Sequence, residues 1–246
     1  MSDPTAHSSD GSFTRRTLLG FAAAAAVPVV LASCAARPRS SDRLPASVDS
    51  FEVAYRETLH RCLSASAGDL SSGDVTAIIL LHGAGQTGSQ WFRIGLVDAL
   101  LRLDSSFPSV VAVAPEIGRP AYAESMITDA LFPAIEQRFS PDRYAISGIS
   151  RGGAMALDLA LRVPTLFRSV GLHSPASMLD HTVEPMPWRC WLDIGDDDYL
   201  LDGALQTGRS LRESGVDITE HLWIGEHQEK YWAAHIDDYL AFHLAA

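Results

Sequence analysis

Residues 144–153 read Tyr-Ala-Ile-Ser-Gly-Ile-Ser-Arg-Gly-Gly and contain a Gly-x-Ser-x-Gly pattern at positions 148–152. A short apolar run precedes the pattern and a helical stretch, 154–162, follows it, which predicts a sharp strand-to-helix turn at Ser150. At such a turn two backbones approach closely, so a Cβ at either flanking glycine would collide. Ser150 is therefore a candidate nucleophile, and a serine that merely caps a helix is the simpler alternative.

From residue 75 onward, apolar runs alternate with longer amphipathic stretches. The expected strands are 75–81, 110–114, 144–147, 169–173, 190–194 and 218–223, and the expected helices are 91–103, 124–139, 154–162, 201–213 and 231–243. Strand and helix in repeated alternation predict an α/β fold with a doubly wound, mostly parallel sheet flanked by helices, in which ligands bind at the carboxyl ends of the strands.

Two further segments complete the expected architecture. Residues 51–66 alternate weakly between apolar and polar side chains, which favours an antiparallel pair of strands at a sheet edge. Only about a dozen residues, between 175 and 188, connect two of the expected strands. That connection is too short for a large helical lid, so we expect an open, shallow site.

A serine hydroxyl needs a base that takes its proton and a third group that orients the base. Gly-Asp-Asp-Asp at 195–198 and Ile-Gly-Glu-His at 224–227 each follow an expected strand, and both loops belong to the same edge of the sheet as Ser150. The resulting order of Ser150, Asp198 and His227 is the order found in α/β-hydrolases.

Each of these positions has an alternative. His221, His235 and His243 compete with His227, but one lies within an expected strand and two within the last expected helix, where packing or surface roles are more common. The three aspartates at 196–198 could form a solvated loop or a cation site, although they lack the spacing of a calcium loop with its closing glutamate. Trp91 and Phe92 could line an acyl pocket or belong to the core.

The chain resembles the esterase D type of α/β-hydrolase, which is related to feruloyl and acetylxylan esterases and to mycolyltransferases. The resemblance covers roughly residues 78–243. Its matching pieces are Leu-His-Gly-Ala-Gly at 81–85, the serine pattern followed by Gly153, Gly-x-x-Asp at 195–198, and Gly-x-His at 225–227 followed by Trp232.

The resemblance implies roles for single residues. Asp198 is then the acid, His227 the base, and the backbone N–H groups of Ala84 and Arg151 form the oxyanion hole. We expect no cofactor and no metal. The family more often has Met in place of Arg151 and Gly in place of Glu226, and since neither side chain serves the core reaction, these departures concern substrate preference.

The first 33 residues are typical of an export signal. Thr14-Arg15-Arg16-Thr17-Leu18-Leu19 resembles a twin-arginine signal, and Leu31-Ala32-Ser33-Cys34 resembles a lipobox, in which Cys34 would be lipidated. An ordinary secretory signal with a chance cysteine is the alternative. We expect a signal at 1–33, a tether at 34–49 and an α/β-hydrolase domain at 50–246, with the protein anchored by lipid to the outer face of the membrane.

Charge bears on whether nucleic acid is a partner, and cysteine content bears on whether the domain has a disulfide. The formal net charge of −11 makes nucleic acid an unexpected partner. Apart from Cys34 the chain has only Cys62 and Cys190, which fall in expected strands far apart in sequence. We expect two buried thiols rather than a disulfide.

These patterns together predict an exported serine hydrolase that cleaves carboxylic esters, either small or borne on a polymer, through an acyl-enzyme on Ser150. The nearest alternative is an acyltransferase that uses the same residues on a cell-envelope alcohol. A non-catalytic surface lipoprotein that uses the cleft for binding is the alternative of a different class.

Overall fold

A computed structural model of the protein describes residues 46–71, 73–118 and 122–245. The expected export signal at 1–33, the expected lipidation residue Cys34 and the first part of the expected tether lie outside the described residues. The chain divides into two compact units, and all described residues belong to the second, Pro38–Ala246.

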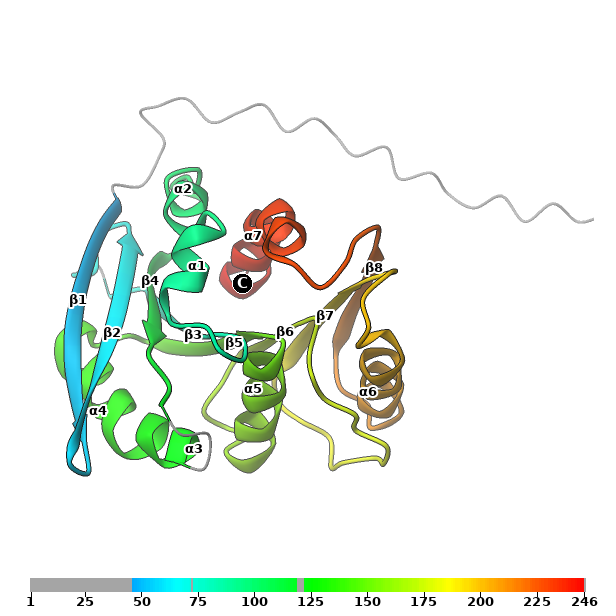
Figure 1. Cartoon of the computed structure of the whole chain (residues 1–246). Coiled ribbons are helices and arrows are strands. Elements are labelled where there is room, and N and C mark those ends of the chain that lie inside the picture. The colour runs from blue at the N-terminus through cyan, green and yellow to red at the C-terminus, as the bar shows by residue number, and fades with distance from the viewer. Residues whose placement is uncertain (1–45, 72, 119–121, 246) are drawn as a thin grey trace, which may run out of the picture. The chain divides into compact units, whose positions relative to one another are not determined.

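The described residues form one eight-stranded sheet in the order β1-β2-β4-β3-β5-β6-β7-β8 (Figure 1). Strand β2 runs antiparallel to both β1 and β4, and the strands from β3 to β8 are parallel to their neighbours. The expected doubly wound α/β-hydrolase architecture is therefore confirmed. The strands are β1 (Ala46–Tyr55), β2 (Thr58–Ala67), β3 (Val75–Leu81), β4 (Ser109–Pro115), β5 (Arg143–Ile149), β6 (Ser169–His173), β7 (Arg189–Gly195) and β8 (Ile218–Trp223).

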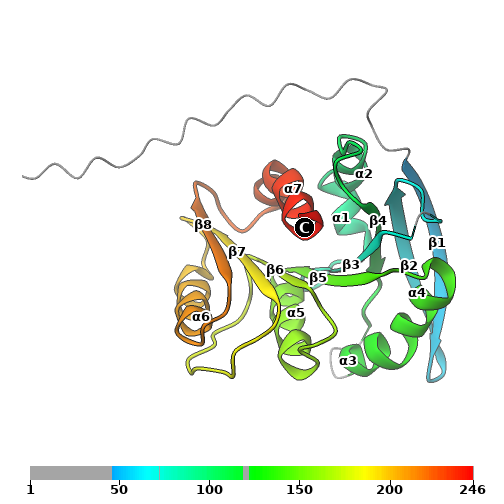
Figure 2. The same cartoon turned by 180° about the vertical axis from the view of Figure 1, so that it is seen from behind.

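Helices cover both faces of the sheet (Figures 1 and 2). One face carries α1 (Ser89–Arg93), α2 (Leu96–Leu100) and α7 (Glu229–Leu244), and the other carries α3 (Ala123–Met126), α4 (Phe132–Phe139), α5 (Arg151–Arg162) and α6 (Leu201–Glu213). Alternate side chains of one strand supply the two cores: Ile79 packs with the α3–α6 layer and Ile78 with the α1, α2 and α7 layer. Residues 174–188 connect β6 to β7 without a helix.

Three segments differ most from the sequence prediction. Strand β1 begins at Ala46, so the last four residues of the expected tether are strand; they belong to the ten-residue register with β2, on an edge strand where most of their side chains are exposed. The expected helix 91–103 is divided because Gly95 takes a left-handed conformation, with φ +100°. The expected helix 124–139 contains a π-helical turn, Ile127–Leu131, just before Pro133, which lacks the N–H that an α-helical bond needs.

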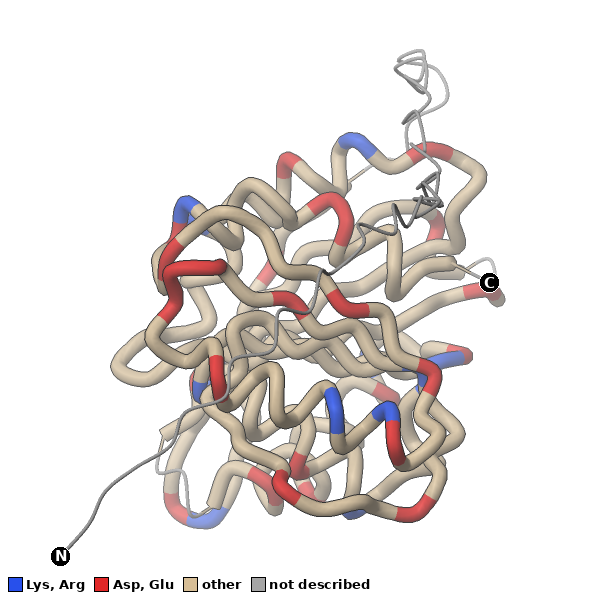
Figure 3. The backbone as a smooth tube through the Cα atoms, turned by 90° about the vertical axis from the view of Figure 1, so that its right-hand side faces the viewer, with Lys and Arg blue, Asp and Glu red and all other residues tan. Residues whose placement is uncertain are grey.

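The two cysteines of the described domain are free thiols in β2 and β7, as expected. Burial raises the pKa of the Cys62 thiol to about 12, so this group stays protonated and unreactive at neutral pH. No described helix is long and apolar enough to span a bilayer. Within the described residues, Lys and Arg are scattered among more numerous Asp and Glu in the view of Figure 3, with no continuous basic band.

Candidate active site

Ser150 joins β5 to α5 in a backbone conformation that L-residues rarely adopt, with φ +56° and ψ −119°. Such a conformation costs roughly 1–3 kcal/mol and persists only where neighbouring contacts fix it. Here the Ser150 N–H donates to His173 O (2.8 Å), and Ser150 O accepts from Ala176 N–H (2.9 Å). These bonds fix the turn at the carboxyl edge of the sheet, where Ser150 is 8% exposed.

The glycines beside Ser150 make the turn possible. A Cβ added to Gly148 would meet the carbonyl of Gly152, and a Cβ added to Gly152 would meet the carbonyl of Leu81 in β3. Both obstacles are backbone atoms, which cannot rotate away as a side chain can. Gly148 and Gly152 therefore have the steric role that the sequence pattern predicts.

His227 and Asp198 come together across the carboxyl ends of β7 and β8. His227 Nδ1–H donates to Asp198 Oδ2 (2.8 Å), which leaves Nε2 as the ring's free acceptor. The Asp198 carboxylate also accepts the Leu200 N–H at Oδ1 (2.9 Å) and the Ser174 hydroxyl. Burial opposes its ionisation, but these hydrogen bonds outweigh burial and lower the pKa of Asp198. Asp198 is thus an ionised, buried partner of the imidazole.

The neighbouring aspartates occupy different surroundings. Asp196 and Asp197 are exposed, whereas the Asp198 side chain is fully buried. Asp196 Oδ1 accepts the Gly225 N–H (2.9 Å) and so fastens the loop after β7 to the loop after β8. Of the three, only Asp198 contacts His227.

Ser174 is a part of the site that sequence reasoning missed. It is fully buried at the end of β6 with φ +45°, and its N–H donates to Asp193 O (2.8 Å). Its hydroxyl accepts from Trp232 Nε1–H (3.2 Å) while donating to Asp198. A serine after a strand carries no motif, so only the requirement of a buried carboxylate for donors could have pointed to this position.

The loop after β3 contains Ala84, whose N–H is one of the expected oxyanion donors. His82, buried at the start of this loop, donates from Nδ1 to Gly83 O (2.8 Å) and accepts the Ile117 N–H at Nε2 (3.1 Å). Burial lowers the pKa of His82, which keeps the ring neutral and suited to that pair of bonds. Gln90 Oε1, also buried, accepts the Gly83 N–H (2.8 Å). These side chains fix the loop, a role for Gln90 that the sequence did not predict.

The other expected donor is the N–H of Arg151. It is the first residue of α5, and the first N–H groups of a helix have no acceptor inside that helix.

Ser150, Ala84 and His227 all line one cavity of about 300 Å³, whose wall also includes Gln90 and Trp232. Among the described residues Ser150 Oγ makes no hydrogen bond to His227, an arrangement often seen in unliganded sites, where that bond tightens once substrate is present.

The competing residues of the sequence prediction lie elsewhere. None of His221, His235 and His243 lines the cavity: His221 and His235 each stack against Trp223, and His243 is buried with its Nδ1 beside Ser169 Oγ. Trp91 is fully buried and donates from Nε1 to Leu81 O (3.2 Å), so it belongs to the core and not to an acyl pocket.

A second Ser–His–Asp set lies inside the sheet. Ser147 Oγ is 2.6 Å from His173 Nε2, and His173 Nδ1 is 2.5 Å from Asp193 Oδ1. All three residues are at most 1% exposed. Substrate cannot reach Ser147, so this set is structural, and the carbonyl of its histidine is the acceptor that holds the Ser150 N–H.

Comparison with known proteins agrees with this geometry. The family model "Putative esterase" matches residues 102–235, more than half of the chain. The chain belongs to this esterase family. The protein is thus an esterase-type hydrolase with an α/β-hydrolase fold, while comparison with curated proteins finds no match.

Solved structures support the fold. A ferulic acid esterase is similar at 19% identity and a TM-score of 0.73, over 81% of this chain and 98% of that one. The fluorophosphonate-binding serine hydrolase FphF of Staphylococcus aureus is similar at 14% identity and 0.71, over 82% and 100% of the chains. The S-formylglutathione hydrolase FrmB of the same organism matches at 15% and 0.68, over 86% and 100%. At these identities the likeness speaks for the fold alone.

Proposed function

We propose that the protein is a serine esterase that hydrolyses carboxylic esters through an acyl-enzyme on Ser150. The observation that carries the proposal is that a strained, sheet-edge serine shares one cavity with His227, whose imidazole is bonded to the buried Asp198 behind it. Strained backbone of this kind is concentrated at functional sites, because it disappears unless the surrounding structure enforces it.

In the acylation step, Ser150 Oγ attacks the acyl carbon while its proton passes to His227 Nε2. The Asp198 carboxylate stabilises the imidazolium through the Nδ1–H bond. The carbonyl oxygen becomes an oxyanion, for which the N–H groups of Ala84 and Arg151 are the donors. Collapse of the intermediate breaks the bond to the alkoxy oxygen, and His227 returns its proton to the leaving alcohol.

In the second step, water takes the place of the alcohol. His227 Nε2 removes a proton from the water as its oxygen attacks the acyl carbon, and the same two amides stabilise the second oxyanion. Collapse breaks the bond between the acyl carbon and Ser150 Oγ, His227 returns its proton to that oxygen, and a carboxylic acid is released. No atom in either step comes from a cofactor.

The shape of the site suggests accessible esters as substrates. The cavity is small, and Gln86, Gln228 and Glu229 give part of its wall a polar character. Residues 174–188 contribute no helix that could close over it. Short acyl groups, on small molecules or on a polymer, fit such a site better than long lipid tails.

Water is the proposed acceptor of the acyl group, and product analysis in graded glycerol tests this. A share of acyl-glycerol in excess of the acceptor-to-water mole ratio would instead indicate a transferase.

Labelling with a fluorophosphonate followed by peptide mapping tests the nucleophile. The probe should modify Ser150 in the folded protein, and Ser150→Ala should abolish labelling while Ser147→Ala should not. An unlabelled Ser150 in folded, wild-type protein would refute the esterase mechanism and favour a binding module.

For localisation, we propose export through the twin-arginine signal and lipid anchoring at Cys34 on the outer face of the membrane. The support is the sequence of residues 14–19 and 31–34 alone. Cys34→Ala should move the protein from the membrane to the soluble fraction. Unchanged retention in the membrane would reject anchoring at this residue.

A further inference from the structure

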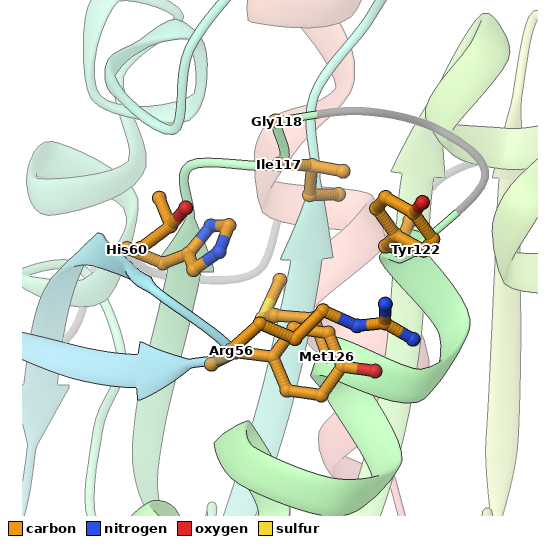
Figure 4. Close-up of a pocket in the computed structure, with 9 residues that line it drawn as sticks. Arg56, His60, Ile117, Gly118, Tyr122 and Met126 are labelled. Atoms are coloured by element: carbon orange, nitrogen blue, oxygen red, sulfur yellow. The ribbon is translucent and has the colours of Figure 1, made fainter.

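A second cavity opens at the same edge of the sheet, past the carboxyl end of β4 (Figure 4). Its volume is about 360 Å³, and it shares no lining residue with the cavity at Ser150 among the described residues. Cys62 of β2 pairs with Pro115 at the end of antiparallel β4, so the first residues of β2, which pair only with β1, extend past the end of β4 and form one wall. The opposite wall comes from α3 and the residue before it.

Arg56 supplies a positive charge at this cavity. Its guanidinium carbon lies 4.3 Å from the centre of the Tyr122 ring and 5.5 Å from that of Tyr55, and Figure 4 shows the side chain extended toward Tyr122. A hydrogen bond to Tyr55 uses part of the group. Within the described part of the chain no Asp or Glu forms an ion pair with Arg56, and a guanidinium has five N–H donors. Arg56 is exposed, so the remaining N–H groups are accessible to a ligand that enters from solvent.

The backbone at Arg56 gives an independent reason to suspect a ligand. Tyr55 pairs with Thr58, so Arg56 and Glu57 alone make the turn between β1 and β2. Arg56 has φ +54°, a conformation for which glycine is the ordinary residue in a two-residue turn. Unfavourable backbone of this kind is concentrated at ligand clamps and active sites, where a side chain must be held in one place.

The remaining walls fix the chemistry of the ligand. Ile117, Met126 and the ring of Tyr122 provide an apolar surface facing the cation. His60 donates from Nδ1 to Glu116 O (3.2 Å), which leaves Nε2 as a hydrogen-bond acceptor. We propose that this cavity binds a small carboxylate with an apolar body about the size of one ring. The planar guanidinium of Arg56 holds the carboxylate through paired hydrogen bonds, and the body rests on the apolar wall.

The site stands on its own geometry, but its relation to the reaction rests on the proposed function. Hydrolysis of an ester forms a carboxylate, and an intact ester has no negative charge at that group. The cavity would thus bind either a released acid or a carboxylate carried elsewhere on the substrate. Both sources present the same chemistry to Arg56.

Binding is measured on the Ser150→Ala protein by calorimetry, with benzoate and cyclohexanecarboxylate as probes and benzamide as the neutral control. Both acids should bind, and benzamide at least tenfold more weakly, because charge-assisted hydrogen bonds are the stronger kind. Arg56→Gln should weaken acid binding at least tenfold, and Arg56→Lys less. Arg56→Gly removes the cation while relaxing the turn, so its loss of binding cannot be ascribed to misfolding. Arg102→Gln, which removes a distant exposed charge, should bind normally.

Three results would overturn the proposal: equal binding of benzamide, unchanged acid binding by Arg56→Gln, or loss of acid binding when fluorophosphonate occupies Ser150 in the wild-type protein.

A second experiment decides whether the bound carboxylate is a released acid or part of the substrate. It compares two matched esters that differ only in a distal carboxylate or carboxamide. If the carboxylate ester has the lower KM and this difference disappears in Arg56→Gln, the cavity binds a carboxylate of the substrate. If the two esters have equal KM values, the cavity binds the released acid. If no ester is turned over, the proposed function fails while the calorimetric result still decides the site.

Discussion

Two Ser–His–Asp sets lie in neighbouring parts of this sheet, and they differ in completeness and access. In the buried set, hydrogen bonds run without a break from Ser147 through His173 to Asp193. The cavity set has the His227–Asp198 bond but no bond from Ser150 to His227. The more complete chain is the one that substrate cannot reach, so an unbroken hydrogen-bond chain is no evidence of a catalytic site.

The buried set is instead a fully satisfied polar network. Asp193 also accepts from Trp191 Nε1–H (2.8 Å) and from Tyr239 O–H (2.9 Å), and the His173 ring stacks on Tyr239 at 3.6 Å between centroids. Such networks make a core specific when every member is bonded. Its backbone supports the other set directly, because His173 O holds the Ser150 N–H and Asp193 O holds the Ser174 N–H. One set supports the position of the other.

Replacing each serine by alanine should separate the two sets most strongly. Ser150→Ala should lower kcat by about 10⁵–10⁶, the scale of nucleophile removal in serine proteases. Ser147→Ala should keep kcat within about threefold but lower the free energy of unfolding by roughly 1–3 kcal/mol, since it leaves buried His173 Nε2 without a partner. Turnover of a short-chain ester and guanidinium denaturation measure both quantities. Comparable losses of kcat would show that the buried set takes part in catalysis.

The aspartates give the next largest contrast. Asp198→Asn keeps the size of the side chain but loses the charge that steadies the imidazolium, which costs about 10⁴ in turnover in serine proteases. Asp196→Asn and Asp197→Asn should cost about tenfold or less, because exposed charges act through a screened field. Turnover of the three variants, with folding checked by thermal melts, decides between them. If Asp198→Asn stays active while one neighbour's variant fails, the acid has been assigned to the wrong residue.

How far the sequence predicts this site depends on whether a residue acts within its own segment. Ser150, His227 and the strand ends follow local patterns, and the ranges expected for β3, β6 and β8 match the structure. The left-handed conformation of Gly95 and the π-helical segment before Pro133 are backbone conformations, and hydrophobic periodicity does not reveal them. Ser174 acts through Asp198 and Trp232, which are distant in sequence, and Gln90 acts through Gly83 in the preceding loop. No pattern in their own segments marks either residue.

A smaller effect is expected at Ser174, whose hydroxyl links Asp198 to Trp232. Removing one hydrogen bond to a carboxylate costs about 1.5–3 kcal/mol, so Ser174→Ala and Ser174→Gly should each lower kcat roughly 10- to 100-fold with little change in KM. Their stabilities should differ, because glycine accepts the φ of +45° without strain and alanine does not. If kcat follows stability instead of the missing hydroxyl, Ser174 does not position the acid.

The smallest expected effect concerns the pH dependence of stability beside the buried set. His243 is buried, and burial first, then the nearby His173 and Arg189, lower its pKa from 6.5 to about 3. The unfolded chain therefore takes up a proton below about pH 6.5 that the native protein refuses, so the free energy of unfolding falls as the pH drops from 6.5 toward 3. His243→Gln, which has no proton to gain, should flatten this decline, whereas His181→Gln at an exposed position should not. Guanidinium denaturation between pH 7 and 5 measures the slopes. Identical slopes for wild type and His243→Gln would show that His243 does not contribute to this pH dependence.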